Sequence, residues 1–276
     1  MVAAPTPLPA AGAPERPVLI SVRDLEVGFG AKTIMKGLSL NIYKGEILGF
    51  VGASGTGKSV LTRTILGLVS KRAGTIEVFG YDVDHLTQQE VAKIGRRWGV
   101  LFQQGALFSS LTVKQNIQVP MREYLNLSEE LLDELAALKI RMVGLRADAG
   151  DKFPSELSGG MIKRAALARA LALDPEIVFL DEPTSGLDPI SAAEFDDLIA
   201  TLQKTLGLTV FMVTHDLDSL YAICNRVAAL GEGRVIAEGP IDVVANWDNP
   251  WLQSYFHGTR GRAAVAAKDT AGQGVR

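Results

Sequence analysis

The stretch Gly52-Ala53-Ser54-Gly55-Thr56-Gly57-Lys58-Ser59 directly follows an apolar run at residues 47–51. It fits the pattern G-x-x-x-x-G-K-[ST], in which a strand breaks into a loop whose backbone N–H groups point inward at phosphate. The glycines permit positive φ and close approach of the backbone. We expect Lys58 to reach the terminal phosphates, Ser59 to offer its hydroxyl to Mg²⁺, and a helix over residues 58–69 to present its positive dipole end. The stretch predicts a phosphate-binding loop, called the P-loop below.

Two carboxylates, Asp181 and Glu182, end a second apolar run at residues 177–180. A buried strand that ends beside a phosphate site has this form, because metal and water must be held there. We expect Asp181 to hold Mg²⁺ through water and Glu182 to polarise the attacking water. With the P-loop upstream, the pair indicates hydrolysis of a nucleoside triphosphate rather than an ordinary solvent loop.

Strand-like and helical runs alternate along the chain, which predicts an α/β fold with a P-loop NTPase core and a parallel sheet. Short apolar runs at residues 47–51, 98–102, 177–180 and 209–213 are typical of buried parallel strands. Residues 19–27, 33–42 and 75–79 favour strands joined by turns, so an antiparallel β portion is expected near the start. Residues 227–230 and 234–237 flank Gly231-Glu232-Gly233 and predict a hairpin.

The segment 112–157 differs, because its pattern is helical and contains no parallel-strand run. Ser128, followed by two glutamates, predicts a helix N-cap. Leu131, Leu135, Leu138 and Met142 follow at helical spacing and are expected to form the apolar face of that helix. We expect a helical subdomain inserted into the core over about residues 104–165.

Composition limits the classes of partner. The chain has 276 residues, of which 47% are hydrophobic, and its net charge of −3 gives no electrostatic reason to expect nucleic acid. A single cysteine, Cys224, agrees with a reducing compartment. Each long apolar stretch is interrupted by charge or glycine before the ~20 residues that cross a bilayer, so no membrane span is expected.

The two ends of the chain differ in composition from the middle. Residues 1–17 are rich in Ala and Pro without a secretory pattern, and we expect a disordered leader before a domain over residues 18–239. Residues 240–276 are expected to hold a C-terminal helix and a mobile tail. Trp247, Trp251, Tyr255 and Phe256 recur there at helical spacing. They could pack on this domain or embrace a neighbouring subunit, and the pattern leaves both open.

The run Leu157-Ser158-Gly159-Gly160-Met161-Ile162-Lys163-Arg164-Ala165-Ala166-Leu167-Ala168-Arg169-Ala170 resembles the signature motif of ATP-binding-cassette (ABC) ATPases. Ser158 is expected to cap a helix whose free N–H groups, beside Gly159 and Gly160, form a second anion site. In that family the signature loop of one subunit closes over the ATP held by the P-loop of the other. The resemblance implies an ABC ATPase fold, ATP and Mg²⁺ as ligands, and a second copy of the chain as partner.

Four further positions match the family one by one. Gln103 corresponds to the glutamine that joins the Mg²⁺ and water shell and couples the core to the helical lobe. Residues 185–188, ending in Asp188, resemble the loop that crosses the dimer interface. His215 resembles the switch histidine that contacts the γ-phosphate, and Phe29 takes the place of an adenine-stacking aromatic residue that is more often Tyr.

Residues 99–113, Met161 and residues 164–169 resemble the ATPase subunits of bacterial lipid-asymmetry (Mla-type) transporters. The resemblance implies phospholipid as the transported substrate. It also implies an integral permease, an MCE-domain protein and a STAS-domain regulator as partners at the cytoplasmic face of the inner membrane. The apolar segment 104–111, which includes Leu107 and Phe108, suits a permanent partner. The same residues could instead pack the insert onto the core, and the sequence leaves both open.

Two other functions keep the same P-loop. An importer subunit for amino acids or another polar solute has the same motor motifs and is the main alternative. A soluble ABC protein acting on ribosomes or DNA usually has two cassettes or a long coiled coil, whereas this chain has one P-loop, one signature motif and no sustained heptads. A kinase or GTPase explains neither the signature motif nor His215.

Overall fold

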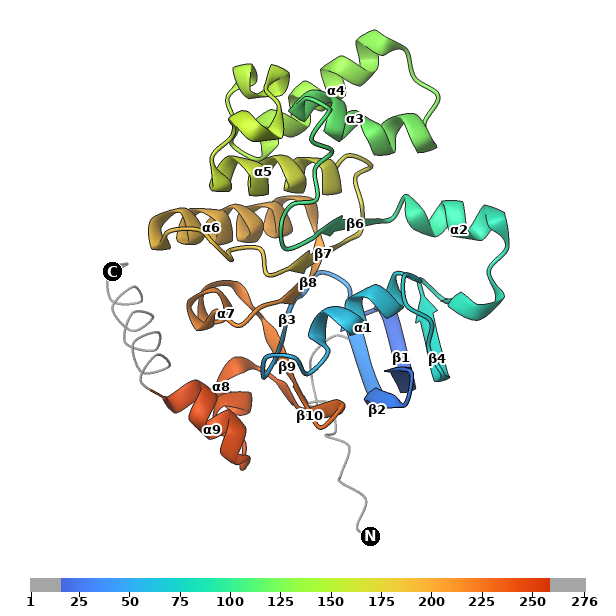
Figure 1. Cartoon of the computed structure of the whole chain (residues 1–276), viewed down its shortest axis with the longest axis vertical. Helices are drawn as coiled ribbons and strands as arrows, with labels where there is room; N and C mark the ends of the chain where they lie inside the picture. Colours follow the sequence, from blue (N-terminus) through green and yellow to red (C-terminus); the bar gives the residue numbers. More distant parts are fainter. Residues whose placement is uncertain (1–15, 259–276) are drawn as a thin grey trace.

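A computed structural model of the protein describes residues 16–258. Most of the predicted leader and the predicted tail after residue 258 lie outside the described residues. Two β-sheets and a group of helices make up the described part of the chain, and Figure 1 shows their arrangement.

The central sheet has six strands in the order β10-β9-β3-β8-β7-β6. Their bounds are β3 Ile47–Gly52, β6 Trp98–Leu101, β7 Ile177–Asp181, β8 Thr209–Val213, β9 Arg226–Gly231 and β10 Arg234–Gly239. The neighbouring pairs from β9 to β6 are parallel, and β10 pairs antiparallel with β9. Each residue of β3, β7 and β8 is buried, as in a parallel sheet covered on both faces. The predicted α/β core and the predicted hairpin are confirmed.

A second sheet, antiparallel, lies near the start of the chain with the strand order β2-β1-β4-β5. Its strands are β1 Val18–Phe29, β2 Lys32–Tyr43, β4 Ala73–Val78 and β5 Tyr81–Asp82. Buried and exposed residues largely alternate along β2 and β4, because one face of the sheet packs on the core and the other meets solvent. The expected antiparallel portion is therefore present.

The helices form a lobe beside the sheet and layers against it. The helical lobe, at the top of Figure 1, consists of α3 Val113–Tyr124, α4 Glu129–Met142 and α5 Gly159–Ala170, with the 3₁₀ turns η2 Ala147–Asp151 and η3 Pro154–Glu156. α5 contacts α3 and also β6, so it joins the lobe to the sheet. The other helices before residue 240 are η1 Val83–His85, α2 Gln88–Gly95, α6 Pro189–Leu206 and α7 Leu217–Ile223, besides α1 below. Within residues 16–258 no helix combines the length and the apolar character needed to cross a membrane.

Helix α4 begins where predicted but buries a different face. The Ser128 hydroxyl accepts a hydrogen bond from the Leu131 N–H at 3.3 Å, which confirms the cap. Of the predicted stripe, Leu131 and Leu138 are exposed, whereas Leu135 and Met142 are partly buried against the core. The buried stripe is Leu132, Ala136 and Ile140, one residue further along. Both stripes are mainly apolar at helical spacing, so the packing against α3 and α5 decides between them.

The helix after the P-loop, α1 Lys58–Ile65, ends four residues before the predicted end at residue 69. The Leu66 N–H bonds the Thr62 carbonyl as a helix cap, and Gly67 follows at φ 74. A left-handed residue closes an α-helix, so the apolar residues beyond it cannot extend α1.

The C-terminal aromatic residues pack on this chain. α8 Ile241–Ala245 and α9 Pro250–His257 are two short helices, with Trp247 between them. Phe256 is completely buried, and its ring meets Tyr221 of α7 edge-on at 6.3 Å between centroids. Trp251 and Tyr255 stack on each other at 5.0 Å and are partly buried against the same cluster. Of the two alternatives left open by the sequence, the described residues adopt packing on their own domain.

Candidate active site

The P-loop connects the carboxyl end of β3 to α1. Gly57 precedes α1 at φ 103, and a Cβ there would lie 2.4 Å from Cγ2 of Ile34 in β2, so glycine is required for conformation and for space. Ser54 and Gly55 are exposed, and Gly55 has φ 76. Among the described residues no heavy atom lies within 4 Å of the place where a Gly55 Cβ would stand. The loop is therefore open to an external group at this point.

Lys58 folds back over the loop that precedes it. Its ammonium donates to the main-chain oxygens of Gly52 at 2.8 Å and Ala53 at 3.2 Å. Burial lowers the pKa of Lys58, while the negative charges of Glu182 and Asp181 oppose that shift. The ammonium thus hydrogen-bonds two loop carbonyls within the electrostatic influence of two carboxylates.

Ser59, in the first turn of α1, and Asp181, the last residue of β7, come together. The Ser59 hydroxyl donates to Oδ1 of Asp181 at 2.9 Å, and Asp181 is 6% exposed. A hydroxyl and a carboxylate are hard oxygen ligands of the kind that Mg²⁺ prefers, so this pair fits the predicted metal. Gln103, the third predicted ligand, stands two residues beyond β6 with an exposed side chain. Within the described chain that side chain makes no hydrogen bond to Ser59 or Asp181.

Glu182 and His215 form the second contact of the site. Oε2 of Glu182 lies 2.6 Å from Nδ1 of His215, and the histidine side chain is 63% exposed while that of Glu182 is 13% exposed. Glu182 has φ 51, in the left-handed region that a side chain other than glycine enters at a cost. Its N–H donates to the Val213 carbonyl of β8 at 2.8 Å. The Glu182 carboxylate thus lies at the end of the sheet, on a residue whose backbone is left-handed.

Sequence reasoning missed one residue at this site, Lys163 of α5. It is 5% exposed, and its ammonium donates to the main-chain oxygens of Gln103 and Glu182, the latter at 3.1 Å. The sequence had one signal for it, a lysine among the alanines and leucines of the signature run. Which groups that lysine meets depends on loops about 20 and 60 residues away in the chain, which no local pattern reports.

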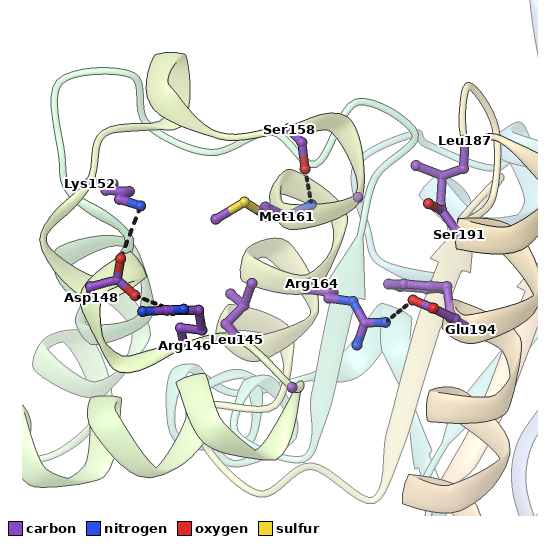
Figure 2. Close-up of a pocket in the computed structure, with 13 residues that line it drawn as sticks. Leu145, Arg146, Asp148, Lys152, Ser158, Met161, Arg164, Leu187, Ser191 and Glu194 are labelled. Carbon is purple, nitrogen blue, oxygen red and sulfur yellow. Dashed lines mark hydrogen bonds and ion pairs between the residues drawn. The ribbon is translucent and has the colours of Figure 1, made fainter.

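The signature residues lie on a separate cavity of about 600 Å³ (Figure 2). Ser158 caps α5, accepting from the Met161 N–H at 3.3 Å, and it is exposed together with Gly159. Arg164 of α5 faces Glu194 of α6 across the cavity at 3.4 Å. A Cβ at Gly160 would meet no heavy atom within 4 Å among the described residues. Packing within the chain therefore does not explain the glycine at Gly160, which suits approach by an outside group.

The predicted interface loop leads into α6. Asp188 caps that helix by accepting from the N–H groups of Ile190 and Ser191, each at 3.1 Å. Hydrogen bonds from Ser191, ahead of that from Ile190, lower the pKa of Asp188. Leu187 of the same loop would lie 3.8 Å from a Cβ at Gly159, so the interface loop borders the signature segment. Ser185 and Gly186 line a second cavity of about 430 Å³ together with Glu182 and His215.

Phe29 and the apolar segment 104–111 are both at the surface. Phe29 ends β1 and is 54% exposed, on the hairpin whose Ile34 contacts Gly57 of the P-loop. In the segment 104–111, Leu107 packs against the core whereas Phe108 is 53% exposed. Leu107 therefore packs within the chain, whereas Phe108 lies at the surface.

Comparison with known proteins gives a family match. A family model described as ABC transporter matches residues 35–185, which includes the P-loop, Asp181, Glu182 and the signature segment. Among solved structures, the dimeric post-hydrolysis state of the ATP-binding cassette MJ0796 bound to ADP and Pi has a TM-score of 0.73 and 30% identity to this chain. The match covers 80% of this chain and 98% of that one.

Curated relatives include transporter subunits with different named substrates. The intermembrane phospholipid transport ATP-binding protein MlaF of Haemophilus influenzae is 40% identical over 221 residues, 80% of this chain and 83% of the relative. The probable ribonucleotide transport ATP-binding protein mkl of Mycobacterium leprae is 37% identical over 243 residues, 88% of this chain and 70% of the relative. The methionine import ATP-binding protein MetN of Caulobacter vibrioides is 42% identical over 215 residues, 78% of this chain and 64% of the relative.

Proposed function

The chain belongs to the ABC transporter family, and from that premise we propose that it drives phospholipid movement between the inner and outer bacterial membranes. It is an ABC transporter ATPase subunit that binds and hydrolyses ATP. The similarity to MlaF over 83% of that protein supports phospholipid as the substrate class. The contact pairs Ser59–Asp181 and Glu182–His215, beyond the carboxyl ends of β3, β7 and β8, support the assignment of hydrolysis to this edge of the sheet.

Each residue of that edge has one proposed task. Lys58 binds the terminal phosphates, and His215 contacts the γ-phosphate while orienting the Glu182 carboxylate. Glu182 polarises a water whose oxygen bonds to the γ-phosphorus as the bond to the bridging β–γ oxygen breaks. The electron pair of that bond leaves with ADP, and the water proton passes to Glu182.

Ser59, Asp181 and Gln103 are the proposed Mg²⁺ ligands. The ion, when bound, neutralises charge that develops on the β- and γ-phosphate oxygens. Ser59 and Asp181 are already in contact, so the hydroxyl and the carboxylate need little rearrangement to face a common ligand. Gln103 is exposed, and its side chain would have to turn toward them to share that ligand.

We also propose that the complete ATP site needs a second copy of the chain. Ser158 and Gly160 line a cavity that includes no P-loop residue, and Gly160 is open to an outside group. The dimeric state of the related MJ0796 supports the same arrangement. Asp188 and Phe29 are the proposed interface and adenine contacts of this dimer. Closure of the two copies on two ATP molecules would move the helical lobes, proposed to span about residues 104–165.

The transport partners follow from the proposed substrate. An integral permease, an MCE-domain protein and a STAS-domain regulator would complete the assembly, with this chain peripheral at the cytoplasmic face of the inner membrane. Phe108, half-exposed beside the helical lobe, is the proposed contact for the permease.

The assignment of Glu182 is tested by Glu182→Gln. The amide keeps the shape of the side chain but cannot take a proton. We therefore expect the turnover rate to fall at least about 100-fold, with ATP affinity unchanged and an ATP-dependent dimer retained. ATPase rate, equilibrium ATP binding and size-exclusion chromatography are the measurements. Glu123→Gln, at an exposed position of α3, is the control. Wild-type turnover of Glu182→Gln would remove Glu182 from its role.

One alternative rests on a specific observation, the 42% identity to a methionine importer subunit. The two substrate classes separate when the chain is purified together with its permease. Phospholipid bound in that complex supports the lipid assignment, and a bound amino acid or other polar solute supports the importer.

A further inference from the structure

Helix α5 buries a positive charge directly beneath the proposed catalytic residues. Lys163 is 5% exposed, and both hydrogen-bond acceptors of its ammonium within residues 16–258 are backbone carbonyl oxygens, those of Gln103 and Glu182. Burial lowers the pKa of Lys163, and the charges of Glu182 and Asp181 oppose that shift. An ammonium is costly to bury, so a helix that needed only apolar packing would be better served by leucine or methionine here.

The two carbonyls belong to different parts of the site. Gln103 begins the segment that leads from β6 into the helical lobe, and Glu182 is the residue directly after β7. On its amide side Glu182 is held by the Val213 carbonyl of β8 at 2.8 Å. Lys163 holds the carbonyl side at 3.1 Å. The left-handed backbone of Glu182 is thus fixed from both directions, and one of them comes from the signature helix.

A second cation on the same helix binds the neighbouring carbonyls without reaching Glu182. Arg169 donates to the main-chain oxygens of Gly105 at 2.8 Å and Ala106 at 2.7 Å. α5 therefore grips the backbone between Gln103 and Ala106 at three carbonyls. Of the two cations, Lys163 also binds the backbone of Glu182, directly after β7.

We propose that Lys163 is a positioning residue for ATP hydrolysis, whose buried ammonium ties the backbone of Gln103 to that of Glu182. The position of the signature helix then sets the position of the Glu182 carboxylate relative to the γ-phosphate. This inference rests on the proposed role of Glu182. It links movement of the helical lobe to the hydrolytic step through one side chain rather than through general packing.

The test compares two buried lysines of the helical lobe. Lys139 of α4 is 2% exposed, but its ammonium pairs with the exposed Asp174 at 2.5 Å and meets neither Gln103 nor Glu182. For Lys163→Met we expect kcat to fall about 10- to 100-fold, because a small misplacement of a catalytic group has this effect, while ATP affinity stays within about twofold. Lys139→Met is expected to keep kcat within about twofold after correction for folded protein. Lys163→Arg should recover most of the rate, since a guanidinium can also donate to two carbonyls.

A double-mutant cycle separates this inference from the proposed function. In the Glu182→Gln background, Lys163→Met should lower the residual single-turnover rate by less than about threefold, because the lysine acts through the residue already replaced. Full additivity there would overturn the positioning role while leaving Glu182 in place. Wild-type turnover of Glu182→Gln would instead overturn the proposed function.

Three other results would also overturn the inference. The first is an unchanged kcat in Lys163→Met, and the second is a loss of ATP affinity in that variant as large as its loss of kcat. The third is a fall of kcat in Lys163→Arg as large as that in Lys163→Met. If Lys163→Met does not fold although Lys139→Met does, Lys163→Gln takes its place under the same criteria, since its amide can still donate to one carbonyl.

Discussion

At the carboxyl end of the central sheet, Lys58, Ser59, Asp181 and Glu182 each contact another group of the chain, whereas Ser158 and Gly160 of the signature segment border an open cavity. Ser59 meets Asp181, Glu182 meets His215, and Lys58 meets the loop carbonyls. Ser158 makes its helix-cap bond and otherwise borders an open cavity.

The difference shows that the two proposed phosphate-binding segments are assembled in different ways. Parallel strands bring residues far apart in the chain to one edge, so the P-loop half is assembled by folding alone. The signature half stands on a helix N-terminus beside an open cavity, and in the proposed dimer the second copy would fill that cavity. Substitutions in the two halves should therefore fail in different ways.

The largest effect is expected for Lys58→Ala, in the half assembled by folding. Loss of the ammonium removes the charge that receives the terminal phosphates, so ATP hydrolysis should fall about 1000-fold and ATP affinity should fall with it. Lys204→Ala, at an exposed position of α6, is the matched control and should stay within about twofold. Unchanged ATP affinity in Lys58→Ala would mean that this loop does not bind the phosphates.

In the outward-facing half, Ser158→Arg should lower hydrolysis about 100-fold but leave ATP binding to the isolated chain within about twofold. The arginine fills the space that a partner's nucleotide would enter, while the P-loop stays intact. Ser155→Arg, an exposed position three residues earlier, is the control. If Ser158→Arg weakened ATP binding as much as Lys58→Ala, the two halves would belong to one intrachain site.

Mixing these two variants sharpens the comparison further. A mixed dimer has one site that combines the intact P-loop of the Ser158→Arg chain with the intact signature segment of the Lys58→Ala chain. An equimolar mixture should recover about a quarter of wild-type activity, since about half the dimers are mixed and one of their two sites works. The absence of any recovery would contradict a site shared between two copies.

A smaller effect, on stability, is expected from a buried carboxyl beneath the folded half. Asp196 of α6 is 4% exposed and accepts from the Ser219 hydroxyl of α7 at 2.6 Å. Burial raises the pKa of Asp196 to about 7, against the hydrogen bond from Ser219 and together with the charges of Asp216, Asp197 and Asp218. Between its unfolded and folded pKa values the folded state binds more protons, so this group makes stability fall as pH rises.

Between about pH 5.5 and pH 7 the wild type should therefore lose about 2 kcal/mol of unfolding free energy that Asp196→Asn does not lose. Urea denaturation of both proteins at the two pH values measures the difference. Parallel curves for the two proteins would show that Asp196 is ionised in the folded state throughout this range.

The smallest effect should come from the helical lobe, away from both phosphate-binding loops. Thr112 and Gln115 cap α3 reciprocally, with hydrogen bonds of 3.3 Å and 2.9 Å. Thr112→Ala should cost about 1 kcal/mol of unfolding free energy, and Thr112→Ser should restore it. ATP affinity should not change in either variant, and a change would tie this cap to the nucleotide site.

Much of the fold followed from local patterns. The parallel strands were predictable because short apolar, β-branched runs next to Gly-rich or acidic turns are typical of buried strands. The helix cap at Ser128 was predictable because capping is a local interaction. The buried face of α4 was not predictable, since its two apolar stripes lie one residue apart. The packing of α4 against α3 and α5 determines which stripe is buried. The early end of α1 depended on Gly67, whose left-handed backbone outweighs the apolar residues that follow.

The candidate site divides in the same way. Motif order was enough to place Lys58, Ser59, Asp181 and Glu182 at one edge of a sheet, because parallel strands share their carboxyl ends. The hydrogen-bond partners of the Lys163 ammonium could not be predicted, since they are main-chain oxygens, which every residue has. The packing of Phe256 and its aromatic neighbours on their own domain was also visible only in the folded chain.

The amino-acid sequence by itself determined the family and the class of reaction, because a phosphate-binding loop and its acidic partners need particular residue types at particular spacings along short segments. Only the tertiary structure determines which of these groups contact one another and which face solvent or an open cavity. Contacts such as Glu182 with His215, or Lys163 with two distant carbonyls, depend on the summed packing of strands and helices far apart in the chain. No short segment contains that information, because each such segment gains its stability only from the others.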